Sequence, residues 1–221
     1  MNEKSGGITL SAERPGKRLL SLREAIVLAD VCDREHCIRN DVDGGVFAGT
    51  TIRYDVDSHR RYDWISVPVF AAIYGNAFVI SDRMFRDTIA TKLCVLGAHR
   101  LRHMMDRPRP TEIVPIDTYL AIPLGALWSA VKPRIDLYRK GLSRIREEDI
   151  SRGESVRFRF SGLSVEEAAQ LGEDGEDMEN ILADYLYLTE DDIKFARLYS
   201  RACLVMDWPR QGTGGRHSAR A

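Results

Sequence analysis

The 221-residue chain has no long apolar run. A helix that crosses a membrane needs roughly 20 predominantly apolar residues, and none of the apolar stretches approaches that length. The first 18 residues, "MNEKSGGITLSAERPGKR", also lack the apolar segment of a secretory signal. The four cysteines follow no disulfide framework: Cys32, Cys37, Cys94 and Cys203. A cytoplasmic protein with reduced thiols is therefore expected.

The familiar catalytic motifs are incomplete. The segment "GGVFAGTT" has the glycine spacing of a phosphate-binding loop, but Thr50 stands where the lysine belongs. The segment "HRLRH" places His99 and His103 one helical turn apart, as in zinc proteases, yet Arg100 replaces the general-base glutamate. A serine nucleophile motif of the GxSxG type is missing as well. These gaps argue against an enzyme.

Metal binding has little support in the sequence. Cys32, His36 and Cys37 lie close together but have no fourth ligand nearby, so partly buried reduced thiols explain them better. We therefore expect no cofactor and no metal. A metal-dependent enzyme centred on His99, His103 and Asp106 stays open as an alternative, which elemental analysis would decide.

Net charge is nearly absent, at −1, but the charges are strongly patterned. Residues 83–109 hold seven basic residues and two acids, whereas residues 147–200 hold fifteen acids and five bases. The last segment, residues 201–221, returns to four arginines and one aspartate. Blocks of alternating sign suggest separate surfaces for separate partners, although solvated helix faces explain any single block.

The N-terminal segment has the outline of a helix-turn-helix. Ser21 and Glu24 form a capping box at the start of a first helix. Asp33 is expected to cap a second helix that runs to about Asp41, and Gly44-Gly45 is expected to end it. The following "VFAGTTIRYDV" has the composition of a strand. Helix, turn, helix and strand together suggest a helix-turn-helix with a wing.

The exposed side of the second helix carries groups that read bases. Arginine pairs with guanine and asparagine with adenine in the major groove, so the DNA-binding candidates are Arg34, Glu35, Arg39 and Asn40. Many small helical domains share this outline, however. The first 60 residues hold nine bases and ten acids, which gives little attraction for phosphate. DNA binding would then depend on a homodimer or on the basic segment 83–109.

The remaining chain is expected to be mainly helical. One helix should end at Gly75, and another should begin at Ser81 and bury Phe85, Ile89, Leu93 and Leu96. A short strand pair in "EIVPIDTYLAI" should follow, and then a helix that Pro133 could kink. The resulting predicted divisions are residues 1–60, 61–145, 146–203 and a flexible tail, 204–221.

Two short helices joined by an acidic turn end the folded part. The apolar stripe of the first helix is expected to consist of Met178, Ile181, Leu182 and Tyr185. Thr189 should cap the second helix with Asp192 as its capping-box partner. Acids in this first turn suit the positive end of the helix dipole, so most of the acidic turn has a structural explanation.

This C-terminal pattern resembles the antitoxin-like domains called domain of unknown function 433. Their motif reads, roughly, "E-I-L-x-D-Y-P-x-L-T" followed by "x-x-D-I-x-x-A-x-x-Y-A". The matching residues are Val165, Gly175, Ile181, Leu182, Asp184, Tyr185, Leu188, Thr189, Asp192, Ile193, Ala196 and Tyr199. Leu186 stands where the family has proline, and the segment "GESVRFRFSGLSV" only partly keeps the family's entry sequence.

The order of segments along the chain also resembles longer antitoxins of VapB type. The resemblance implies a homeodomain-like C-terminal domain, repression of the protein's own operon and inhibition of a partner PIN-type ribonuclease. Arginines of the tail would enter the carboxylate cluster of such a nuclease. The toxin-binding candidates are Trp208, Arg210, Arg216 and Arg220. The alternative is a stand-alone helix-turn-helix regulator of transcription without a toxin partner.

Overall fold

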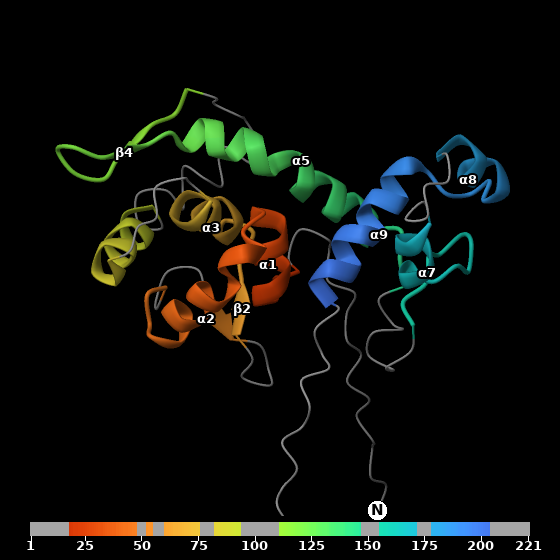
Figure 1. Cartoon of the computed structure of the whole chain (residues 1–221), viewed down its shortest axis with the longest axis horizontal. Coiled ribbons are helices and arrows are strands. Elements are labelled where there is room, and N and C mark those ends of the chain that lie inside the picture. The colour runs from red at the N-terminus through yellow and green to blue at the C-terminus, as the bar shows by residue number, and fades with distance from the viewer. Residues whose placement is uncertain are drawn as a thin grey trace, which may run out of the picture.

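The computed structural model describes residues 18–47, 52–54, 60–75, 82–93, 111–146, 155–171 and 178–203. These residues form a mainly helical protein (Figure 1). Its elements are α1 (Leu22–Ala29), the 3-10 turn η1 (Cys32–Arg34), α2 (Glu35–Asp43), β1 (Ile52–Tyr54), β2 (Arg60–Tyr62), α3 (Ser66–Tyr74), a helix over residues 83–93, β3 (Val114–Pro115), β4 (Ala121–Ile122), α5 (Leu124–Leu142), α7 (Val165–Gln170), α8 (Met178–Asp184) and α9 (Glu190–Cys203). The expected mainly α class is confirmed.

The N-terminal elements follow the expected order. The Ser21 hydroxyl accepts from the amide of Glu24 at 3.1 Å, and the Glu24 carboxylate accepts from the amide of Ser21 at 2.6 Å. The capping box is thus confirmed. The segment after α2 forms an antiparallel hairpin in which Ile52 of β1 pairs with Tyr62 of β2. Gly45, with φ of 86°, adopts the left-handed conformation that glycine favours, and it is the second residue after α2.

Two details at helix starts differ from expectation. Asp33 lies inside η1 and makes no capping hydrogen bond to α2, because the 3-10 turn continues directly into the helix. Asp82, rather than Ser81, caps the helix over residues 83–93, since its carboxylate accepts from the amide of Phe85 at 3.1 Å. Ser81 and Leu96 lie outside the described residues.

The hydrophobic core is organised around α1 and α3. Every residue of α3 is buried, as expected for a helix that is apolar on all sides. α1 packs against α3, α5 and α9, and α5 packs against α9 (Figure 1). At Gly141 of α5 an added Cβ would overlap the ring of Phe195, so this close crossing with α9 requires glycine. One core therefore extends from Leu20 to Tyr199 and crosses the predicted divisions at residues 60 and 145.

The middle of the chain also agrees with its pattern. α3 ends at Gly75, β3 pairs with β4, and α5 continues through Pro133, whose ring lies on the exposed side. Where "GESVRFRFSGLSV" suggests a strand, residues 155–164 form only isolated bridges around a turn in which Gly162 has φ of 69°. Among the described helices, none combines the length and the apolar character that crossing a bilayer requires.

Candidate functional site

The second helix of the N-terminal unit, α2, has one exposed polar face and one face that is packed against the core. Ile38 and Val42 on the inner side are 0% and 3% exposed, and Asp41 between them is also buried. Arg34, Arg39 and Asn40 lie on the outer side, exposed as their spacing along the helix predicts. Three of the four DNA-binding candidates are thus exposed, and the fourth is partly buried.

The outward-facing side chains are held by contacts among themselves. Arg39 donates to Glu35 Oε1 from Nε at 3.0 Å and from Nη2 at 2.6 Å. The Asn40 amide nitrogen lies 3.1 Å from His36 Nε2, and Arg34 lies 3.2 Å from the Asp33 carboxylate. These surface pairs are worth only about 0.2–1 kcal/mol each, so a stronger ligand would displace them.

Glu35 has a different place from the other three DNA-binding candidates. It is partly buried, and it forms an ion pair with Arg23 of α1 in addition to its contact with Arg39. Arg23 also donates to the main-chain carbonyl of Arg201 at 3.1 Å, near the end of α9. Glu35 therefore positions Arg39 and links α2 to the core, rather than pointing freely outward.

The β-hairpin is fastened beside the end of α2. Arg60 of β2 forms a 2.5 Å ion pair with Asp43, the last residue of α2. The backbone of Tyr62 bonds in both directions with that of Leu20, at 2.8 Å each, which joins the hairpin to the segment before α1. The structure thus places a third exposed arginine, Arg60, next to the polar face of α2.

A buried polar cluster behind α2 was not found from the sequence. Asp41 accepts from Arg86 at 2.5 and 2.8 Å and from the Tyr74 hydroxyl at 2.7 Å. Two causes raise the pKa of Tyr74 well above its usual range: burial, which is the larger, and the hydrogen bond to Asp41. The bond to Asp41 likewise raises the pKa of Arg86. One signal was available: Arg86 shares a helical stripe with Ile89 and Leu93, which marks it as inward-facing.

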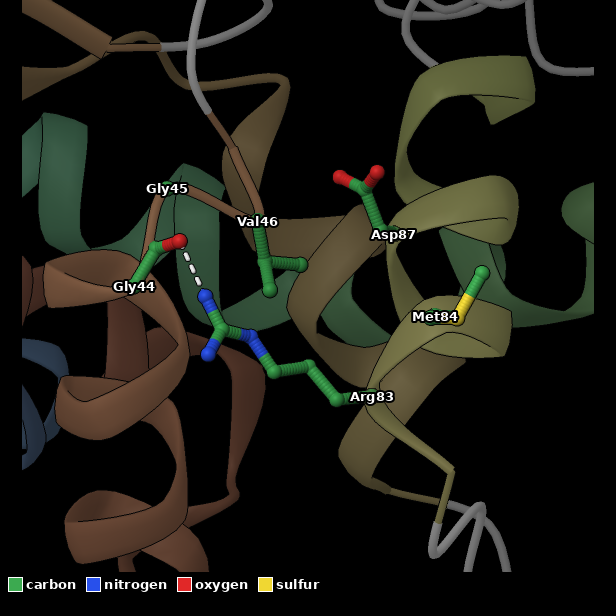
Figure 2. A pocket seen from close by; sticks show the side chains of 6 residues that line it. All are labelled: Gly44, Gly45, Val46, Arg83, Met84 and Asp87. Atoms are coloured by element: carbon green, nitrogen blue, oxygen red, sulfur yellow. Dashed lines mark hydrogen bonds between the residues drawn. The ribbon is translucent and has the colours of Figure 1, made fainter.

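A shallow pocket of about 340 Å³ lies between the end of α2 and the helix over residues 83–93. Figure 2 shows Arg83 extending across the pocket to donate to the carbonyl of Gly44. The side chains of Met84 and Asp87 point away from the Arg83 guanidinium. A Cβ added at Gly44 would overlap the Arg83 guanidinium, so this contact requires glycine at that position. The pocket brings together one guanidinium and one carboxylate, with no nucleophile among its lining residues.

The described residues do not bring the metal-binding candidates together in a cluster suited to a metal ion. Cys32, Cys37 and Cys203 are free thiols, and Cys32 Sγ lies 3.6 Å from a guanidinium nitrogen of Arg201. Within the described ranges there is no group of three or more histidine, cysteine, aspartate or glutamate side chains suited to a metal. His99, His103 and Asp106 lie outside those ranges, as do Trp208, Arg210, Arg216 and Arg220 of the tail.

The C-terminal motif residues serve mainly to build α8, α9 and their connection. Thr189 and Asp192 form the expected capping box, with the Thr189 amide and hydroxyl donating to the Asp192 carboxylate at 2.8 and 2.7 Å. Ile193, Ala196 and Tyr199 are buried on α9. These residues of the motif therefore have structural roles.

A scan against protein-family models, a search of curated proteins and a search of solved structures each find no match for this chain.

Proposed function

We propose that this protein is an antitoxin that binds operator DNA through α1, α2 and the hairpin and inhibits a PIN-type ribonuclease through its C-terminal region. The observation that carries the proposal is that α2 has a buried, fixed inner face and an exposed polar outer face. Its inner face is fixed by Ile38 and by the bond from Arg86 to Asp41, while its outer face offers Arg34, Arg39 and Asn40. A helix used for base reading needs such a fixed base and an outer face of polar groups.

DNA binding would use a small exchange of partners on this face. Arg39 leaves the carboxylate of Glu35 and donates to guanine, and Asn40 leaves His36 and pairs with adenine. Arg34 and Arg60 contact phosphates on either side, where their exposure and positive charge suit them. Because the ion pairs broken are on the surface, this exchange costs little free energy.

The toxin-binding half of the proposal rests on the C-terminal resemblance. The capping box of Thr189 and Asp192 and the buried stripe of α9 are the arrangement that the motif requires. The basic tail that follows α9 would insert Arg210, Arg216 or Arg220 among the metal-binding carboxylates of the nuclease.

The DNA-binding test is the double variant Arg39→Ala/Asn40→Ala, titrated into DNA from the region upstream of the protein's own gene. We expect the loss of about 2–6 kcal/mol of discrimination between this DNA and a scrambled sequence, at about 1–3 kcal/mol for each base contact. Lys132→Ala, which removes a partly exposed cation from α5, is the control and should leave discrimination unchanged. Unchanged discrimination in the double variant would show that α2 does not read bases.

A stand-alone regulator of transcription is the second candidate. It is favoured by the burial of Ile193, Ala196 and Tyr199, since the C-terminal motif then has a folding role that needs no toxin. Co-expression with the adjacent reading frame distinguishes the two functions. An antitoxin should co-purify with a small nuclease and inhibit it, and a chain ending at residue 203 should lose the inhibition. A regulator should bind DNA alone and retain no neighbour.

A further inference from the structure

The turn between α8 and α9 exposes apolar side chains next to another exposed aromatic residue. Phe160, Tyr185, Leu186 and Tyr187 are 68%, 38%, 80% and 71% exposed, and we call these four residues the aromatic patch. The other large apolar side chains that the structure shows exposed, Met84, Ile113 and Tyr119, lie on different elements.

Arg144 holds the two parts of the aromatic patch together. Its guanidinium carbon lies 5.8 Å from the centroid of the Phe160 ring, and its Nη2 donates to the carbonyl of Tyr187 at 3.2 Å. The same guanidinium forms a 2.6 Å ion pair with the buried Asp192. The Phe160 ring and the Tyr187 main chain, 27 residues apart in the sequence, therefore contact one side chain that is itself anchored in the fold.

The turn that carries the patch is fixed before any partner arrives. The amide of Tyr185 donates to Ile181 at 3.0 Å, and that of Leu188 donates to Tyr185 at 2.8 Å. Leu188 is buried, whereas Leu186 and Tyr187 point away from the core. Because the main chain of the turn is already fixed, binding costs little backbone entropy there, which favours an interface.

The size of the patch fits the apolar centre of a protein interface. A large aromatic side chain can bury about 150–250 Å², so the four residues expose on the order of 500 Å². This is near the upper end for the surface of a monomer, where the largest apolar patch is about 300–600 Å². A standard interface buries about 800 Å² on each partner, with such a centre and a polar rim.

The charges around the patch are of opposite sign on its two parts. Phe160 is flanked by Arg157 and Arg159, whose guanidinium groups donate to main-chain carbonyls. The turn 185–187 follows the exposed Asp184. The acids of the first turn of α9 already pair within the chain, with Lys140, Arg144 and Lys194, so Asp184 carries the acidic side of the patch. In a two-fold symmetric pair, the turn of each copy would lie against the Phe160 side of the other copy. Asp184 would then face Arg157 and Arg159 at two equivalent places in the interface.

We propose that a second copy of this chain docks on the aromatic patch and forms a two-fold symmetric dimer. The opposite charges of the two parts make the patch complementary to itself, whereas an entirely acidic or basic rim would favour a different protein. α8 lies at the end of the molecule away from α2, so the polar faces of both copies stay accessible (Figure 1). The dimer does not depend on the proposed binding of DNA or toxin.

The first test is the mass of the full chain in solution, measured by sedimentation equilibrium. The wild-type chain of 25.0 kDa should form a species of twice that mass. Leu186→Glu should weaken the dimer by at least about 100-fold, because a symmetric interface carries the change twice at its apolar centre. Tyr119→Glu, at a residue 97% exposed on another element, is the matched control and should leave the dimer intact.

The second test reverses the charges. Asp184→Arg should weaken the dimer, because it places a cation opposite Arg157 and Arg159 of the other copy. Adding Arg159→Glu should restore association, with the thermal unfolding midpoint of each variant confirming that it is folded. A wild-type chain that stays at 25.0 kDa, a dimer indifferent to Leu186→Glu, or a double variant without recovery would each overturn the proposal.

Discussion

Two buried aspartates anchor the two regions of the molecule that face outward, and they do so differently. Asp41 lies behind the polar face of α2, where its partner Arg86 is buried as well, at 8% exposure. Asp192 lies behind the aromatic patch, where its partner Arg144 stays partly exposed and also contacts Phe160. The N-terminal anchor thus removes both charges from water, whereas the C-terminal anchor removes mainly one.

The two buried carboxylates are satisfied by different kinds of hydrogen-bond donor. Asp41 depends on side chains from elsewhere in the fold, namely Arg86 and Tyr74. Asp192 also has local donors in Thr189, and its position in the first turn of α9 places it at the positive end of the helix dipole. A buried charge without its distant partner is costly, whereas a charge with local donors tolerates the loss. Stability should therefore depend more on Arg86 than on Arg144.

The largest expected effect is that of Arg86→Met. Among the described side chains, the substitution leaves the buried Asp41 with the Tyr74 hydroxyl and the weak thiol of Cys37 as donors. We expect a loss of about 3–5 kcal/mol in the free energy of unfolding, measured by urea denaturation. Arg83→Met on the exposed side of the same helix is the control and should cost less than about 1 kcal/mol. Equal losses in the two variants would remove the special role of the Asp41 anchor.

Arg144→Met tests the other anchor and should have a smaller effect. Asp192 keeps its hydrogen bonds from the amide and hydroxyl of Thr189, so we expect a loss of about 1–2 kcal/mol by the same measurement. A loss as large as that of Arg86→Met would mean that the local donors do not stabilise Asp192. The expectation that stability depends more on Arg86 than on Arg144 would then be wrong.

The parts of the fold that sequence reasoning predicted are local. The capping boxes of Ser21 and Thr189 join residues three positions apart, and Gly44-Gly45 ends its helix through its own backbone. The polar face of α2 follows from the helical period alone. The N-cap at Asp33 was wrong because a 3-10 turn shifts the helix start, and short turns of this kind have no strong sequence pattern.

The parts that it missed depend on pairing between distant segments. Asp41 and Arg86 lie 45 positions apart, and Arg144 and Asp192 lie 48 apart. Helical periodicity shows that Arg86 faces inward, but it does not identify the carboxylate that it meets. The aromatic patch was missed for a related reason: Tyr185 was assigned to the apolar stripe of α8, whereas the helix ends at Asp184 and the turn carries Tyr185 outward, to 38% exposure.

Tyr74→Phe should give the smallest effect at neutral pH and a distinctive one at high pH. Burial and the bond to Asp41 raise the pKa of Tyr74 in the folded state, whereas an unfolded tyrosine titrates near about 10. Above that pH the folded state holds a proton that the unfolded state has released. The free energy of unfolding therefore falls as pH rises, by up to about 1.4 kcal/mol per pH unit for this group.

Comparing urea unfolding of wild type and Tyr74→Phe from pH 8 to pH 11 isolates this proton. At pH 8 the variant should lose about 1 kcal/mol, the worth of one buried hydrogen bond. Above pH 10 it should lose stability less steeply than the wild type, so that the difference shrinks and then reverses. Tyr138 and Tyr199, whose pKa values burial also raises, titrate equally in both proteins and cancel. Tyr119→Phe, at an exposed site, should follow the wild type throughout, and parallel curves for Tyr74→Phe would place the Tyr74 hydroxyl outside the Asp41 anchor.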